Sequence, residues 1–132
     1  MGFNVEVKPG HVYVTYTGLV DSFDLVSILS VSEFVDNARR LKRVVFDYSQ
    51  SDGTHISEED IRQVSTLMNL ESHFTEDFFA LVIPKDKHVR DEFNILKAII
   101  KSDKSIFEIA ENYDEATTLL NTHIAMVNAS IN

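Results

Sequence analysis

The feature that most constrains the fold of this chain is a pair of short, continuous apolar runs, VVF at residues 44–46 and FFALVIP at residues 78–84. Continuous apolar runs are typical of strands covered on both faces, whereas a strand with one wet face alternates apolar and polar residues. Each run is followed by apolar residues at helical spacing. A helix that joins two such strands makes a right-handed crossover, so the sequence predicts parallel strands with helices packed against them.

An alternating pattern at the N-terminus predicts an antiparallel hairpin. Apolar and polar residues alternate over residues 3–8 and again over residues 12–16, on either side of Pro9-Gly10. Apolar residues at helical spacing predict helices that begin near Asp21, Ser57, Val89 and Tyr113, and residues 105–109 are expected to form a last short strand. The predicted fold class is α/β, one domain over residues 1–132, with a mixed sheet of a hairpin and parallel strands flanked by about four helices.

Composition and charge exclude several kinds of site and partner. With 132 residues, 44% of them hydrophobic, the chain can bury a core of its own. It has no cysteine, which removes disulfides, thiolate zinc sites and thiol catalysis and fits a reducing compartment. A net charge of −9 opposes contact with nucleic acid, and no apolar run approaches the roughly 20 residues of a membrane span. We therefore expect a cytoplasmic protein that neither binds nucleic acid nor inserts into a membrane.

The polar segment after the first buried strand, YSQSDGTHIS at residues 48–57, is the first candidate site. Loops at strand ends commonly carry function. This one has a single glycine and no lysine to cradle a phosphate, and no G-x-S-x-G elbow to present a nucleophile. Its side chains more commonly satisfy loop and cap hydrogen bonds. The candidate phosphorylation or partner-binding residues here are Asp47, Ser49, Thr54, His55 and Ser57.

A second candidate site is a group of cations in this acidic chain, Lys85, Lys87, His88 and Arg90. They lie where the second buried strand gives way to a helix, and cations at a helix start oppose the helix dipole. One interpretation is a surface for an acidic partner or a small anion. The other is a solvated loop whose charge is balanced by the three acids within residues 86–92.

Metal, cofactor and catalytic sites are not indicated. The five histidines are scattered, with no pair at i, i+4 on one predicted helix. His55, beside Asp52 and Glu58, offers at most a weak metal site. No acid and base pair stands out, so we assign no catalytic residue and expect no metal and no cofactor.

The order of elements and the first polar loop resemble the STAS domain of the anti-sigma factor antagonist family, in the SpoIIAA-like superfamily. Members have an apolar strand that ends in aspartate, a polar loop, and an Asp-Ser-Ser-Gly motif whose second serine is phosphorylated by a partner anti-sigma kinase. Residues 44–49 are similar to that strand, Ser57 stands at the phosphorylatable position, and Glu115-Ala116 matches the pair that opens the superfamily's last helix. The resemblance covers most of the chain and implies a non-enzymatic regulatory domain with a protein partner.

The sequence around Ser57 departs from the family motif, because His55-Ile56-Ser57-Glu58 stands in place of Asp-Ser-Ser-Gly. As a helix N-cap, the Ser57 hydroxyl would accept a backbone N–H and contribute about 1 kcal/mol. A phosphate there would add roughly −1.5 to −2 charges beside the acids at residues 58–60. The sequence therefore favours a cap at Ser57 and disfavours a phosphoswitch.

Three functional hypotheses follow, in this order. The first is a non-enzymatic interaction domain that binds a regulatory or kinase-like protein through the polar loop and the following helix. The second is a carrier or sensor of a small apolar or anionic ligand, held between the sheet and a helix near the phenylalanine-containing segments 74–79 and 93–100. The third is an enzyme. Apolar residues in the tail, 121–132, leave a homodimer contact open.

Overall fold

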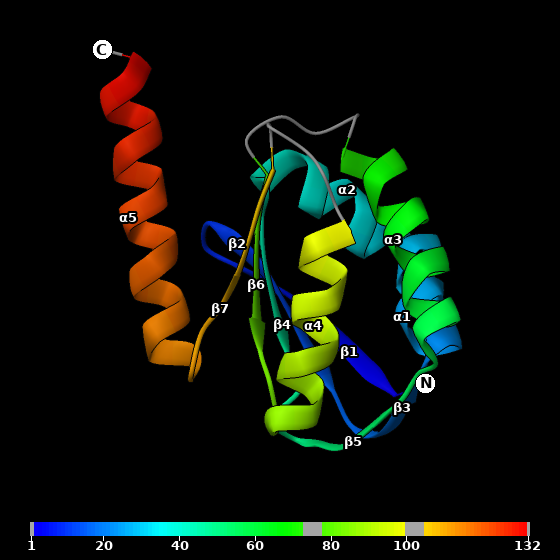
Figure 1. The fold of residues 1–132 in the computed structure, drawn as a ribbon. Coiled ribbons are helices and arrows are strands. Elements are labelled where there is room, and N and C mark those ends of the chain that lie inside the picture. Colours follow the sequence, from blue (N-terminus) through cyan, green and yellow to red (C-terminus); the bar gives the residue numbers. More distant parts are fainter. Residues whose placement is uncertain (1, 73–77, 100–104, 132) are drawn as a thin grey trace.

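The computed structural model describes residues 2–72, 78–99 and 105–131, in which strands and helices alternate (Figure 1). In chain order the elements are β1 (Phe3–Lys8), β2 (His11–Tyr16), β3 (Gly18–Asp21), α1 (Ser22–Ser27), the 3-10 helix η1 (Ile28–Ser30), α2 (Ser32–Leu41), β4 (Arg43–Asp47), β5 (Ser51–His55), α3 (Glu58–Ser72), β6 (Phe78–Ile83), α4 (Lys87–Ile99), β7 (Ser105–Ile109) and α5 (Tyr113–Ile131). None of the helices in these ranges is long and apolar enough to cross a membrane.

One mixed sheet organises the molecule, with the strand order β1-β2-β4-β6-β7. β1 and β2 pair antiparallel on either side of Pro9-Gly10, where Gly10 has a φ of 88° that a side chain would disfavour. β2, β4, β6 and β7 pair parallel to one another. Helix α5 lies on one face of the sheet and α1 to α4 lie on the other (Figure 1). The predicted α/β fold class, with a hairpin followed by parallel strands, is confirmed.

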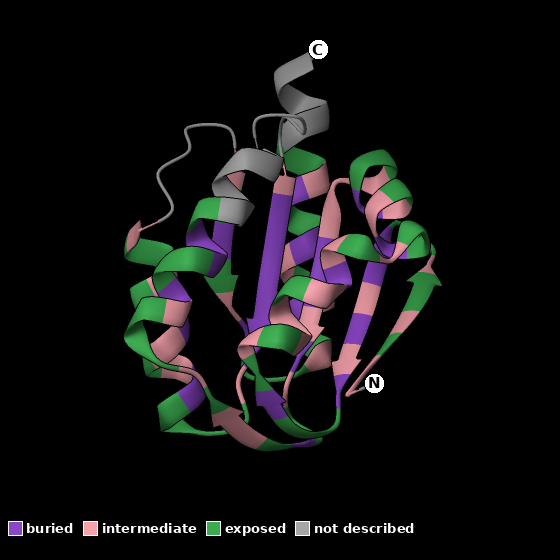
Figure 2. Ribbon diagram, turned by 90° about the vertical axis from the view of Figure 1, so that its right-hand side faces the viewer, coloured by how far each residue is buried: buried purple, intermediate pink, exposed green. Residues whose placement is uncertain are grey.

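The core lies on both faces of β4 and β6, as their continuous apolar sequences predict. Val44 and Val45 point to opposite faces of β4, and both are fully buried. On β6, Ala80 packs towards α4, while Leu81 packs towards α5. Buried residues are concentrated on the central strands and on the inner sides of the helices (Figure 2).

The helix predicted to begin near Asp21 is divided in the structure into α1, η1 and α2, so the described ranges hold more helical segments than the predicted four. Asp21 does cap it: the Asp24 N–H donates to the Asp21 carboxylate over 3.0 Å. The break follows two serines that compete with the helix backbone, since the Ser30 hydroxyl donates to the Ser27 carbonyl over 2.7 Å. At Val31 the backbone is extended, and α2 begins at the next residue.

Residues 51–55 form strand β5, where the sequence predicted a loop. β5 pairs parallel with β3 in a separate two-stranded sheet, in which Val20 is opposite Thr54 and Asp21 is opposite His55. Ser, Asp and Gly are turn-forming residues, so the local sequence carries no strand signal. The pairing arises because β3 lies alongside this segment, which is a tertiary effect.

Candidate functional site

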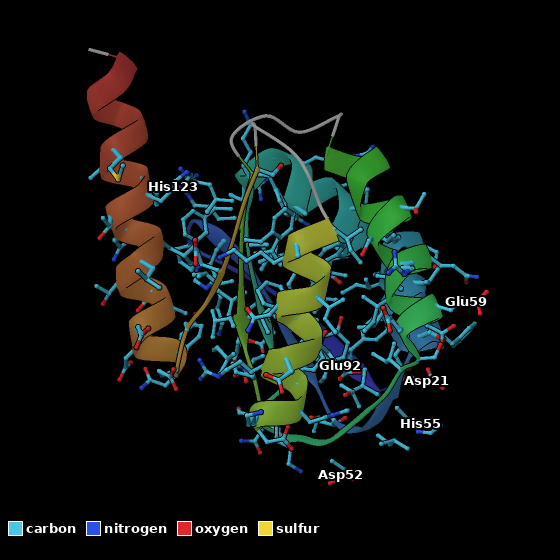
Figure 3. All side chains as sticks on the ribbon, in the orientation of Figure 1. Asp21, Asp52, His55, Glu59, Glu92 and His123 are labelled. Atoms are coloured by element: carbon cyan, nitrogen blue, oxygen red, sulfur yellow. The ribbon has the colours of Figure 1, made fainter. Side chains whose placement is uncertain are left out.

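The predicted site residues gather at the edge of the sheet where the parallel strands end. β4 ends at Asp47 and β6 at Ile83, and helices α3 and α4 begin nearby after short connections. β5 and β3 extend this edge towards the start of α3, as the labelled residues Asp52, His55 and Asp21 show in Figure 3. We call this region the carboxyl edge.

Asp47 is buried at the carboxyl edge and holds the local structure together. Its carboxylate accepts the Tyr13 hydroxyl over 2.5 Å and the Ser49 backbone N–H over 2.9 Å, and only 5% of the residue is exposed. Burial, together with the adjacent Asp47 carboxylate, raises the pKa of Tyr13 to about 12, so its phenol remains a hydrogen-bond donor. Asp47 therefore positions the exposed turn at Ser49 and is not itself presented to a partner.

The start of α5 packs on the sheet through aromatic and polar side chains close to Asp47. The Tyr113 ring packs on Tyr13 with 4.6 Å between ring centroids, and its hydroxyl lies 2.7 Å from His11 Nε2. Burial lowers the pKa of His11, which favours its neutral form. These contacts are structural, and they fix α5 against one face of the carboxyl edge.

Thr54 and His55 leave β5 in different directions. The Thr54 hydroxyl donates to the Glu92 carboxylate of α4, and His88 Nε2 lies 3.5 Å from that same Glu92 Oε1. His55 is exposed on the outer strand, opposite Asp21 (Figure 3). No three His, Cys, Asp or Glu side chains come close enough to hold a metal ion in the described part of the chain.

Ser57 caps helix α3, as predicted, and is exposed. The Asp60 backbone N–H donates to the Ser57 hydroxyl over 3.1 Å, and the Asp60 carboxylate lies 3.4 Å from the Ser57 backbone N–H. This is the reciprocal arrangement of a capping box, with aspartate as the returning acceptor. The three acids at residues 58–60 occupy the first turn and already use the positive end of the helix.

Replacing Ser57 with alanine is therefore expected to lower the free energy of unfolding by about 1 kcal/mol, because the Asp60 N–H loses its acceptor. Ser57→Asp should retain nearly all the stability, since aspartate caps a helix about as well as serine. Urea denaturation of the two variants measures both values. Equal stability of wild type and Ser57→Ala would show that the cap contributes nothing.

The cations of the second candidate site lie mostly in ion pairs. Lys87 Nζ is 3.1 Å from Asp91, and Arg90 is 2.7 Å from Glu111. The side chain of Asp86 caps α4 through the Val89 N–H at 3.1 Å, while Lys85 is exposed. These contacts fit a solvated segment with balanced charge better than a preformed anion site.

An exposed apolar patch on β3 and α1 is the feature that the sequence interpretation missed. Leu19 is 60% exposed, Phe23 is 72% exposed and Val26 is 37% exposed. We call these three residues the Phe23 patch. The three residues are spaced four and then three positions apart, which in a sequence is typical of one face of a helix. They lie outside the apolar face that packs on the sheet. Because β3 pairs with β5, and α1 contacts α3, the patch lies beside His55 and Ser57.

Comparison with solved structures places this arrangement among known folds. The anti-sigma factor antagonist SpoIIAA in its unphosphorylated form matches with a TM-score of 0.53, covering 90% of this chain and 97% of that chain at 12% identity. The chain has the SpoIIAA-like fold. An uncharacterised DUF3478-family protein from Shewanella loihica PV-4, described as having the same fold, matches with a TM-score of 0.55 at 12% identity, covering 89% of this chain and 91% of that one.

The SpoIIAA-like fold confirms the resemblance inferred from the sequence at the level of architecture. No protein-family model matches the chain, and no curated protein matches it either. At 12% identity, structural similarity conveys the fold and not the roles of individual residues. The roles of individual residues in this chain therefore depend on the contacts and exposure of its own side chains.

The fold also contains the space that the carrier hypothesis requires. An apolar cavity of about 120 Å³ lies between the sheet and the helices on the α4 face, and Phe78, Phe93 and Leu96 are among its lining residues. These three come from the two phenylalanine-containing segments identified in the sequence. Residues 74–77 of the first segment and residue 100 of the second lie outside the described residues, and Phe79 packs on the opposite face of the sheet, towards α5.

Proposed function

We propose that this chain is a single-domain, non-enzymatic regulatory protein that binds a protein partner through the Phe23 patch and the adjoining start of α3. The exposure of Phe23, at 72%, carries the proposal. Large aromatic side chains are enriched at binding hot spots, and contiguous exposed apolar patches commonly mark interaction sites. The patch lies next to exposed His55 and Ser57, which would supply a polar rim.

The SpoIIAA-like fold supports a regulatory role, because one protein of this fold is named as an anti-sigma factor antagonist. A non-enzymatic role is supported by the polar residues at the carboxyl edge, because their side chains form hydrogen bonds that stabilise the fold. Asp47 holds Tyr13, Thr54 holds Glu92, and Ser57 caps α3. We propose that the exposed residues Ser57 and Ser49 contribute to partner binding without carrying a phosphate.

The partner is expected to be a protein with an apolar pocket for Phe23 and basic residues at its rim. Basic residues are expected at that rim because the acids at residues 58–60 lie in the first turn of α3, beside the patch. The net charge of −9 makes nucleic acid a poor partner. We place the interaction in the cytoplasm, because the chain has no cysteine that would need an oxidising compartment.

The test is capture of partners from a lysate of the source organism by tagged wild type, Phe23→Ser and Met126→Ser, quantified by mass spectrometry. Met126 on α5 is a matched control, because it is 66% exposed and apolar but lies on the opposite face of the sheet. We expect the partner to be retained by wild type and by Met126→Ser and reduced by about tenfold or more for Phe23→Ser. Equal recovery by all three proteins, with unchanged unfolding curves, would contradict the proposal.

A further inference from the structure

The cavity on the α4 face of the sheet is large enough for a small ligand. Its volume is about 120 Å³, and the side chains that line it are mainly apolar, including Leu25, Ile28, Phe34, Phe78, Phe93 and Phe107. A cavity of about 150 Å³ with a similar lining stays dry and accepts benzene. The space is therefore of the order needed for one aromatic ring or a short branched chain.

A smaller cavity of about 50 Å³ adjoins the first one towards the carboxyl edge. The two share six lining residues, Leu25, Tyr48, Val64, Val82, Phe93 and Leu96. The smaller cavity is also lined by Glu92 and Thr54, so this cavity combines polar groups with the apolar residues that it shares with the larger one. Together the two cavities provide a mainly apolar space with Glu92 and Thr54 at one end, and Arg39 also lines the larger cavity.

Glu92 presents an unsatisfied acceptor at that polar end. Its side chain is 12% exposed, and Oε1 accepts the Thr54 hydroxyl. Within the described ranges, Oε2 is buried and has no hydrogen-bond partner. A buried carboxylate oxygen without a donor is costly, so a donor brought by a ligand would be favoured there. Figure 3 shows Glu92 on α4.

The charges around the polar end favour a cationic head group over an anionic one. Next to Glu92, the lining includes the phenol of Tyr48, whose ring stacks on that of Tyr16 with 4.4 Å between ring centroids. Burial raises the pKa of both phenols, which keeps them neutral. His88 approaches Glu92 from the solvent side, with a 65% exposed side chain 3.5 Å from Oε1. A carboxylate ligand would meet the Glu92 carboxylate here, whereas an ammonium group would pair with it.

We propose that these adjoining cavities bind a small apolar amine, with the ring or branched chain between Phe78 and Phe93 and the ammonium group donating to Glu92 Oε2. This site is separate from the Phe23 patch, so a test of ligand binding here does not depend on whether the proposed function is correct. It also refines the carrier hypothesis, because the Glu92 end of the site favours an apolar ligand with a cationic head group over an anionic one.

Three probes with one ring and different head groups test the site: benzylamine, benzyl alcohol and phenylacetate. Each is titrated into the ¹⁵N-labelled full chain, and the amide signals of Tyr48, Glu92 and Phe93 are followed. We expect benzylamine to bind most tightly and phenylacetate most weakly. No shift of the cavity signals with any probe, or binding of phenylacetate as tight as that of benzylamine, would overturn the proposal on the wild-type protein alone.

Two substitutions then locate the ammonium group. Glu92→Gln should raise the Kd of benzylamine by about tenfold or more and leave that of benzyl alcohol nearly unchanged, because only the charged hydrogen bond is lost. Glu108→Gln is the matched control, since Glu108 is an exposed carboxylate on β7 paired with Lys97 at 3.1 Å. An equal loss of benzylamine binding in both variants would place the amine on the surface and contradict the assignment to Glu92.

Discussion

Replacing Leu81 with alanine is expected to lower the free energy of unfolding by about 2–5 kcal/mol. Leu81 is fully buried on the central strand β6 and packs against Val45, Phe79 and Leu120 beneath α5. The neighbours lie on three different elements, so the core cannot readily collapse around the lost methyl groups. Urea denaturation should show a lower midpoint with an unchanged slope, because the surface exposed on unfolding stays the same.

Leu19→Ala is the matched control for Leu81→Ala, since it makes the same chemical change at a residue that is 60% exposed. It should change the free energy of unfolding by less than about 0.5 kcal/mol. The same variant should weaken partner capture, because Leu19 belongs to the Phe23 patch. If Leu19→Ala destabilised the fold as much as Leu81→Ala, the patch would be part of the core and not a binding surface.

Replacing Asp47 with alanine is expected to lower the free energy of unfolding by about 2–3 kcal/mol. The substitution removes the acceptor of the half-buried Tyr13 hydroxyl and of the Ser49 backbone N–H. The Tyr13 hydroxyl would then lack this partner in a half-buried place, and the turn at Ser49 would lose the bond that positions it. Thermal and urea unfolding of the purified variant measure the loss.

Two further variants separate the contacts made by Asp47. Asp47→Asn keeps an oxygen for the Ser49 N–H and should recover part of the stability, while Tyr13→Phe removes only the hydroxyl and should cost about 1 kcal/mol. An Asp47→Ala variant with wild-type stability but without partner capture would contradict this account, and it would make Asp47 a direct contact residue.

The sequence was most informative where each local pattern agrees with the packing. The runs at 44–46 and 78–83 are buried on both faces, and strand β7 covers the predicted residues 105–109. Asp21 and Ser57 cap the helices that they were predicted to cap, because capping depends on residues only three positions apart. Such short-range interactions can be inferred without knowledge of the fold.

The features that the sequence did not reveal depend on contacts between distant segments. Strand β5 exists because β3 lies beside it, and its own residues favour turns. The pairing of Tyr13 with Asp47 joins residues 34 positions apart. The exposure of Phe23 was also hidden, because its helical spacing is compatible with either a second buried stripe or a free surface.

The most direct test of the proposed function is amide hydrogen exchange of the full chain, free and bound to the partner captured with the wild-type protein. The account predicts that binding slows exchange in residues 18–27 and 57–62, which contain the Phe23 patch and the start of α3. Exchange in residues 113–126 of α5, on the other face of the sheet, should not change. Slower exchange confined to α5, with none at β3 and α1, would contradict it.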